Sequence, residues 1–408
     1  MRTPRSFPPW GLPFILLGLP FAANCGSAEG RMLAQPVVDT LPGDIPRTMS
    51  PSATAWVGET GWQVELVEEI SGEEETPSEL VNPQSIALDD WRRLYVVDQK
   101  PMVIKVYGAD GQFIRTIGGE GEGPGEFRVG FVAVRGAHVV LHDPRVARTS
   151  VWDTAGTFLR SWVSSCCHWG DIHVDRQGRV YIPSMVTRTI DDRRGQVFVR
   201  WTMQGAVVDT VWLPGLTSEG KHWTVTTTEG GRTMGHMSMM VPLAPRVVNG
   251  FNPDGGFLVG QSDSYQIVVA PRGGDSSTVF GRVWSGVPVT VERKRRLVEA
   301  TIQMVGTSYG EDNLRRIFKL EDIPDQAPAF IALHVDGEGN RWVRMDPGLD
   351  STRAVFDVFT AEGVYLGATS IAPAPPEYGR LIFGQDEVVV ARENEAGLPV
   401  VARYRVVR

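Results

Sequence analysis

Three aspartates recur at the same point of a repeated strand pattern. Asp98, Asp143 and Asp346 each end a short apolar run that indicates the second strand of a repeated unit. A ring of carboxylates offers hard oxygen ligands, so these residues could hold a cation at the mouth of a channel. An Asp in such a place also commonly accepts backbone N–H bonds and fixes its own turn. Both roles stay open, and we favour the turn role.

A second group of residues carries soft metal ligands in two short stretches. Thioether, thiolate and imidazole groups are the ligands that suit Cu(I). Methionine is also an adaptable filler of apolar gaps, and this packing role is the interpretation we favour. Adjacent cysteines can instead form a strained vicinal disulfide or remain two partly buried thiols. The candidate ligands are His236, Met237, Met239, Cys166, Cys167 and His168.

Two motifs resemble catalytic or nucleotide-binding signatures but lack their context. Residues 306–310 match G-x-S-x-G, yet a nucleophile elbow needs a strand before the serine, and here a helical pattern precedes it. Residues 215–221 match most of a phosphate-binding loop, but His222 replaces the Ser or Thr that would hold Mg²⁺. We therefore predict no catalytic residue. Trp169, Trp223 and His222 fall in links between units and are candidates for lining a ligand-binding face.

Charge and the N-terminal stretch limit the classes of function. The net charge of −8 and the absence of a basic stripe exclude a general nucleic-acid binder. Residues 1–28 indicate an export signal, because positive residues precede an apolar run at 14–23 that is too short to stay in a bilayer. The residues before Cys25 resemble a lipoprotein box, while residues 26–28 form an ordinary cleavage site. We expect a periplasmic or extracellular protein, with lipid anchoring through Cys25 left open.

The elements that must position these residues are short strands in a repeating order. Apolar runs at 85–88, 94–97, 103–107 and 113–117 are bounded by turn residues and predict a four-stranded antiparallel meander. One meander cannot bury both faces, so it must belong to a larger array. The rhythm recurs along the chain, and the last unit stops after three strands. A strand at 62–67 can supply the fourth.

This arrangement predicts an all-β fold, a six-bladed β-propeller of four-stranded antiparallel blades. The propeller occupies residues 56–408 and is closed by the N-terminal strand joining the C-terminal blade. Residues 29–55 are polar, rich in Pro and non-periodic, and they indicate a linker or a loosely docked N-terminal arm.

A known group shares part of this pattern. Residues 118–127, G-G-E-G-E-G-P-G-E-F, resemble the tail that ends NHL repeats, and residues 94–98 and 105–107 match the middle strands of such repeats. The whole chain is similar to exported bacterial six-bladed β-propeller proteins of this NHL-repeat-like type, many of which carry lipoprotein-type signals. The resemblance implies the fold and a general binding role, and it implies no defined reaction.

Three long insertions lengthen the loops and links of blades three to five. They lie at 183–196, 214–245 and 285–329. In a four-stranded blade, the link from the second to the third strand and the link to the next blade emerge on the same face. All three insertions belong to that face, and function concentrates on loops that a rigid scaffold presents. They predict a lid beside the channel mouth.

The third insertion has a helical pattern. Apolar residues at helical spacing predict a helix over 290–305, and a second short helix should cover 312–320. Ser308 and Glu311 form a capping-box pattern before that second helix.

These features favour an exported binding or scaffolding protein that holds a protein, peptide or glycan on the insertion face. The alternative is a metal-dependent six-bladed propeller enzyme with a lactonase-, lyase- or hydrolase-like activity. A purely structural envelope protein is a third class. No feature of the sequence requires a cofactor, and a cation in the channel is compatible with it. We expect a monomer, with no nucleic-acid partner and with membrane contact only through the lipid anchor.

Overall fold

The fold is seen in a computed structural model. It describes residues 35–56, 61–166, 168–190, 193–213, 220–229, 232–271, 277–306, 309–348, 352–376 and 379–408. The predicted export signal with Cys25, together with Cys167 and Ser308, lies outside these described residues. Within them, no helix is both long and apolar enough to span a bilayer.

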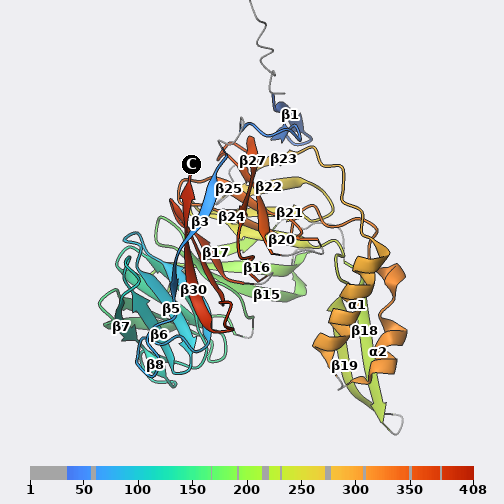
Figure 1. Ribbon diagram of the computed structural model, residues 1–408. Helices are drawn as coiled ribbons and strands as arrows, with labels where there is room; N and C mark the ends of the chain where they lie inside the picture. The colour runs from blue at the N-terminus through green and yellow to red at the C-terminus, as the bar shows by residue number, and fades with distance from the viewer. Residues whose placement is uncertain are drawn as a thin grey trace, which may run out of the picture. The chain divides into compact units, whose positions relative to one another are not determined.

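Six antiparallel sheets of four blade strands form a six-bladed β-propeller, as the sequence predicts (Figure 1). In the first five blades the strands pair in chain order from the inner strand outwards, and in the sixth blade the outer strand comes from residues 63–70. The strands of the first three blades are β4 (Pro83–Leu88), β5 (Leu94–Gln99), β6 (Met102–Tyr107) and β7 (Phe113–Ile117); β10 (Phe131–Arg135), β11 (His138–Asp143), β12 (Arg148–Asp153) and β13 (Phe158–Val163); β14 (His173–Val174), β15 (Val180–Ile190), β16 (Arg193–Trp201) and β17 (Val207–Trp212).

Blades four and five continue the same order, and blade six takes its outer strand from before blade one. Their strands are β20 (Val247–Phe251), β21 (Gly256–Gln261), β22 (Gln266–Pro271) and β23 (Thr278–Arg282); β24 (Ala332–Val335), β25 (Arg341–Arg344), β26 (Ala354–Phe359) and β27 (Tyr365–Ile371); β28 (Leu381–Phe383), β29 (Glu387–Glu393), β30 (Pro399–Val407) and β3 (Gln63–Ile70). A short parallel pair, β8 (Gly119–Glu120) with β9 (Glu126–Phe127), lies in the link between blades one and two.

The ring closes through β3, which pairs antiparallel with β30 from Gln63↔Val407 to Ile70↔Val401. The predicted closing strand at 62–67 is therefore confirmed, and it extends three residues further to Ile70. In blades one, two, five and six most residues of the second and third strands are buried, because apolar side chains from both faces pack against the neighbouring blades.

An aspartate in the same place shapes the turn between the first and second strands of several blades. Asp336 accepts the N–H groups two and four residues further on, at 3.0 and 2.9 Å, and Nε1 of Trp342 at 3.1 Å. Asp89 and Asp175 repeat this pattern with a tyrosine hydroxyl in place of the indole. In each of these turns the buried carboxylate ties the turn to an aromatic core residue.

The segment expected to be a linker or a loose arm forms strands instead. β1 (Val37–Leu41) and β2 (Ile45–Ser50) make a hairpin, and β2 pairs parallel with β23, so that the sheet of blade four has six strands. Gly43 and Asp44 form the turn with φ of 85° and 57°. Polar composition concealed the hairpin, because an outer strand needs no continuous apolar run.

The second and third insertions pack against each other and share one apolar core (Figure 1). We call this unit the insertion module. It consists of β18 (His222–Glu229), β19 (Arg232–Met240), α1 (Val291–Val305), α2 (Glu311–Ile317) and the 3₁₀ helix η2 (Leu320–Asp322).

The helix expected over 290–305 is confirmed, and Thr290 caps it by accepting the N–H of Arg293 at 3.2 Å. The second helix begins at Glu311 after Gly310 and ends at Ile317, so it is shorter than predicted. Most of the first insertion, at 183–196, is an extension of β15 and β16 rather than a loop.

Candidate functional site

A cavity of about 800 Å³ occupies the central channel. The first strands of blades one, two, three and six supply its apolar wall, with side chains such as Ile86, Val132, Val174 and Ile382. The turns between first and second strands supply a charged rim. These turns lie on the face opposite the insertions, because the links between blades leave from the other end of the strands.

The insertion-face end of the channel is crossed by one ion pair. Arg380 precedes the first strand of blade six, and its Nη1 contacts Oδ2 of Asp171, which precedes the first strand of blade three. Blades three and six are opposite each other in a ring of six, so the pair spans the axis. The Arg380 guanidinium also lies 5.4 Å from the centre of the Phe131 ring. The two charges neutralise each other and narrow the passage at this end.

We expect this ion pair to contribute little to stability. Asp171 and Arg380 keep 42% and 31% of their side-chain surface exposed, so solvent screens their attraction. A double-mutant cycle with Asp171→Ala and Arg380→Ala, followed by chemical denaturation, should give a coupling of at most about 1 kcal/mol. A coupling above about 3 kcal/mol would contradict this expectation and make the pair a brace of the ring.

Paired charges also line the opposite mouth of the cavity. Arg135 contacts Asp90 at 3.0 Å, and Arg92 contacts Glu387 at 2.7 Å. Arg176 donates to the carbonyl oxygen of residue 337 at 2.8 Å, which links blades three and five. Each contact joins turns from two different blades. The rim therefore presents hydrogen-bonding groups without a strong net charge.

His173 lies on the channel wall and was not predicted from the sequence. Its ring stacks on Phe251, with centroids 4.5 Å apart and planes 5° apart. Burial lowers the pKa of His173 to about 4, Asp171 acting weakly in the opposite direction. The imidazole is therefore neutral at neutral pH. In the sequence His173 stands between two aliphatic residues, and this pattern indicates only a position in the core.

The structure gives the three predicted aspartates separate partners. Asp98 is fully buried and accepts three backbone N–H groups at 2.9, 2.7 and 3.3 Å and the ammonium of Lys105 at 2.8 Å. Asp143 accepts backbone N–H groups in the same manner. Asp346 pairs with Arg293 of α1 at 2.7 Å. These contacts support the turn role for Asp98 and Asp143, whereas Asp346 anchors the insertion module to blade five.

The soft-ligand candidates do not converge in the described part of the chain. Met237 and Met239 pack against the helices of the insertion module, while His236 lies on the exposed side of β19. Neighbouring residues of a strand point to opposite faces, which separates the imidazole from these thioethers. Cys166 is exposed, and burial lowers the pKa of His168. Among the described residues, no group of three His, Cys, Asp or Glu side chains could hold a metal.

The remaining ligand-face candidates differ in exposure. Trp223 is buried, stacks on Phe318 with centroids 4.5 Å apart, and donates from Nε1 to Asp322 at 2.8 Å. It therefore belongs to the core of the insertion module and does not line a pocket. Trp169 is 56% exposed and contacts Phe131 edge to face. Phe131 lies beside Arg380, at the end of the channel that the Asp171–Arg380 ion pair spans. His222 is exposed at the start of β18.

Comparison with solved structures finds other propeller-type chains at low identity. A Bacteroides fragilis protein described as exported is 13% identical, with a TM-score of 0.46 over 85% of this chain and 96% of that chain. A member of the DUF4221 family from Bacteroides vulgatus is 10% identical, with a TM-score of 0.47 over 85% and 99%.

A third similar structure is the virginiamycin B lyase from Staphylococcus aureus, at 10% identity and a TM-score of 0.40 over 85% of this chain and 100% of that one. No protein-family model matches the chain, and no curated protein matches it in sequence. We take no residue role or activity from these similarities.

Proposed function

We propose that this chain is an exported binding protein that holds a protein partner on the insertion module. The proposal rests on one observation: two insertions that are far apart in the sequence build a unit with its own apolar core. The buried members of this core are Trp223, Val225, Val241, Ala244, Val298, Ile302, Leu314, Phe318 and Ile323.

The module adds no strand to the blades. β18 and β19 pair only with each other among the described strands, while the ring is already closed by β3. The contacts that hold the module together are specific: Lys221 and Trp223 both bind Asp322, and Lys294 binds Asp325 at 2.6 Å. The propeller closes without this unit, yet specific contacts keep the unit folded. Binding of another molecule is the role that best explains such a unit.

One side of the hairpin supplies a surface for that contact. Alternation along the strands directs Trp223, Val225, Met237 and Met239 to the helices and leaves the opposite side to solvent. The described residues on this exposed side are uncharged or carry an imidazole. They are His222, Thr224, Thr226, His236, Ser238 and Met240. Small hydroxyl side chains on a sheet fit a protein surface closely and lose little rotamer entropy on binding.

The test is site-specific photo-crosslinking in cells that produce the full chain. A crosslinking residue at Thr224 or Ser238 is compared with one at Thr116 of β7 or Ser161 of β13, which are exposed hydroxyl residues on the outer strands of other blades. We expect discrete high-mass adducts from the hairpin positions at least fivefold above those from the two controls.

A second variant separates specific contact from proximity. Thr226→Glu, next to Ser238 on the same side, should reduce the Ser238 adduct severalfold, whereas Thr116→Glu should leave it unchanged. The proposal is wrong if all four positions give equal adducts, or if none of them gives an adduct.

A further inference from the structure

The hairpin of the insertion module has a strand edge that no other described residue pairs with. β19 is hydrogen-bonded to β18 on one side, and nothing in the described part of the chain bonds to the backbone on its other side. Helix α2 lies against β18, the other strand of the hairpin. A strand edge without a neighbour presents a row of N–H and C=O groups with which another extended chain can pair.

The register of the hairpin shows which groups of β19 face outwards. The N–H of Val241 donates to the carbonyl oxygen of Lys221 at 2.8 Å, so these opposite residues form a hydrogen-bonded pair. Such pairs alternate with non-hydrogen-bonded pairs along two antiparallel strands. The backbone groups of His236, Ser238 and Met240 therefore point away from β18. They recur at every second residue, which is the spacing at which an added strand pairs.

The blades protect their own outer edges, and five of them do so with charge. A charged side chain on an edge strand is a common protection against unwanted strand pairing. The charged residues on these five edge strands include Arg115 of β7, Arg160 of β13, Asp209 of β17, Asp39 of β1 and Glu65 of β3. In β19 the one Arg, Lys, Asp or Glu is Arg232, the first residue of the strand, and residues 235–240 carry none.

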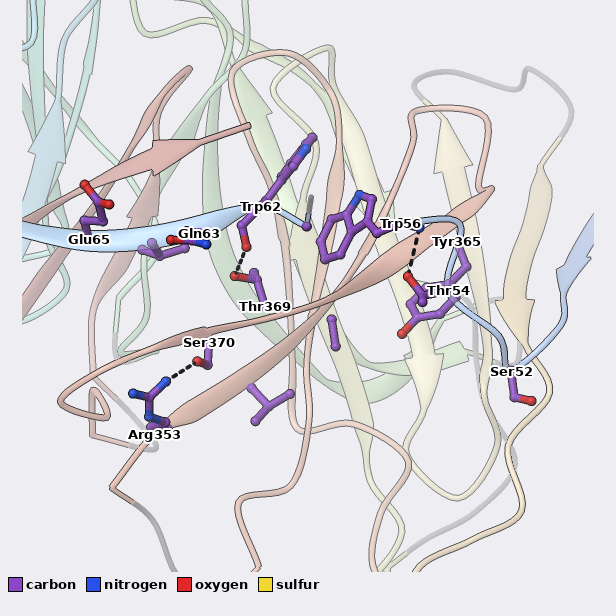
Figure 2. A pocket seen from close by; sticks show the side chains of 14 residues that line it. Ser52, Thr54, Trp56, Trp62, Gln63, Glu65, Arg353, Tyr365, Thr369 and Ser370 are labelled. Atoms are coloured by element: carbon purple, nitrogen blue, oxygen red, sulfur yellow. Dashed lines mark hydrogen bonds between the residues drawn. The ribbon is translucent and has the colours of Figure 1, made fainter. Parts of the chain in front are cut away.

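The outer strand of blade five, β27, has no charge and is covered instead. The N–H of Trp56 donates to the carbonyl oxygen of Leu366 at 3.1 Å, and the hydroxyl of Thr369 donates to the carbonyl oxygen of Trp62 at 2.7 Å. Figure 2 shows both indole rings beside this strand. Over its described part, 235–240, β19 has neither of these two forms of protection, and it differs in this from the outer strand of every blade.

The side chains beside this edge indicate which kind of segment fits. Met237 and Met239 point to the helices but are only half-buried, so part of each thioether stays open to an apolar neighbour. The exposed side of the strand presents uncharged groups and an imidazole. An added strand places alternate residues on these two sides. The fitting segment therefore has apolar residues at every second position and uncharged residues between them.

We propose that β19 accepts an extended segment of the partner protein as a third strand of the hairpin sheet. Main-chain hydrogen bonds to His236, Ser238 and Met240 supply affinity, and apolar residues against Met237 and Met239 supply selectivity. The inference rests on the function proposed above, because it names how the partner of the insertion module is held. A partner that lies flat on the exposed side of the hairpin, without pairing with its edge, would leave that function intact.

The test removes one outward N–H and keeps the hydrogen bonds between β18 and β19. Ser238→Pro does this, because proline is tolerated in an edge strand where the N–H faces away from the sheet. A crosslinking residue at Met240, in cells that produce the full chain, should then lose its partner adduct by about tenfold, because a main-chain bond is lost and the proline ring obstructs the added strand. Ser238→Ala keeps the N–H and should reduce the adduct by no more than about twofold.

Ser161→Pro is the matched control, on the outer strand of blade two. The N–H of Ser164 donates to the carbonyl oxygen of Ala147 at 2.8 Å, so the N–H of Ser161, three pairs further along, also faces outwards. This variant should leave the adduct at Met240 unchanged. Thermal unfolding of the two proline variants checks that both chains are folded.

A second measurement tests strand pairing itself. The segment crosslinked at Met240 is identified by mass spectrometry and made as a synthetic peptide, which should bind the purified full chain saturably. N-methylation of alternate residues removes the N–H groups from one edge of the peptide strand at a time. One of the two alternate sets should abolish binding, and the other should leave it unchanged.

The outcomes separate this inference from the proposed function. Adducts at Thr224 and Met240 that survive Ser238→Pro, or two N-methylated sets that bind equally, would show that the module holds its partner without strand pairing. An adduct of twice the mass of the chain, abolished by Ser238→Pro, would place a second copy of this chain on the edge and overturn the assignment to a separate partner. The absence of adducts from every hairpin position would contradict the proposed function, and this inference with it.

Discussion

Acidification from pH 7 to pH 4 is expected to lower the free energy of unfolding by several kcal/mol. Three histidines cause this effect: His142, which is buried, and His173 and His334, which are half-buried. Burial lowers the pKa of His334 to about 3, with nearby Arg344 acting in the same direction. Burial also lowers the pKa values of His173 and His142 to about 4.

The sign follows from proton binding in the two states. An unfolded histidine has a pKa of about 6.5, so between pH 6.5 and 4 the unfolded chain binds protons that the folded chain does not. Stability is therefore fully present above pH 6.5 and is lost as the pH falls towards the folded pKa values. Since one pKa unit corresponds to about 1.4 kcal/mol, each histidine contributes at most ~3 kcal/mol.

The neighbours of each ring explain why protonation is disfavoured. His334 lies between Phe356 and Phe383, with ring centroids 6.3 and 4.7 Å away. The Nδ1 atom of His142 contacts the hydroxyls of Ser164 and Thr149 at 3.1 and 3.2 Å, and Asp143 offsets its burial only in part.

The measurement is the denaturant midpoint between pH 7 and pH 4.5. His334→Leu should remove roughly a third of the pH dependence, since one of three groups is lost. His222→Gln is the control, because His222 is exposed, and it should leave the slope unchanged. A flat profile from pH 7 to pH 5, or a full slope in His334→Leu, would show that these rings are protonated at little cost.

The blades could be predicted from the sequence because their signals are local. The strand at 113–117 follows a turn in which Gly111 has a φ of 72°, a conformation that glycine adopts without strain. Apolar alternation then fixes which side of each strand is buried. The missing fourth strand of the last blade followed from counting, because an open edge in a closed ring would be left unpaired.

The parts that escaped prediction depend on contacts between distant residues. Asp171 and Arg380 meet only because the ring brings blades three and six face to face, and nothing in either local sequence marks the pair. Trp223 was placed in a link, and only the hairpin of β18 and β19 buries it against Phe318. The candidate metal ligands at 236–239 lie in a strand, so their side chains alternate between its two sides. Their closeness in the sequence does not reveal this separation.

Removal of the closing strand is expected to have the largest effect on stability. A chain beginning at residue 72 lacks β3 and leaves β30 as an unpaired edge in the last blade. It also removes the glutamates that pair with two buried arginines: Glu69 contacts Arg392, and Glu68 lies 3.8 Å from Arg403. Arg392 and Arg403 are 8% and 3% exposed, so Arg392 would lose its carboxylate partner, whereas Arg403 would keep only Glu387 at 3.5 Å.

The loss should exceed about 5 kcal/mol, which is comparable to the whole stability of many domains. We expect this chain to aggregate or to lack a cooperative thermal transition, as measured by circular dichroism and size-exclusion chromatography. A chain beginning at residue 51 is the matched control. It lacks only the β1–β2 hairpin outside blade four, so it should keep a cooperative transition with a melting temperature lowered by a few degrees.

A peptide spanning residues 61–71, added in trans, distinguishes loss of closure from general damage. It should restore a cooperative transition to the chain beginning at residue 72, because it re-forms the register from Gln63↔Val407 to Ile70↔Val401. A scrambled peptide of the same composition should not. If the chain beginning at residue 72 unfolds cooperatively at the temperature of the full chain without any peptide, then closure by β3 is not what stabilises the ring.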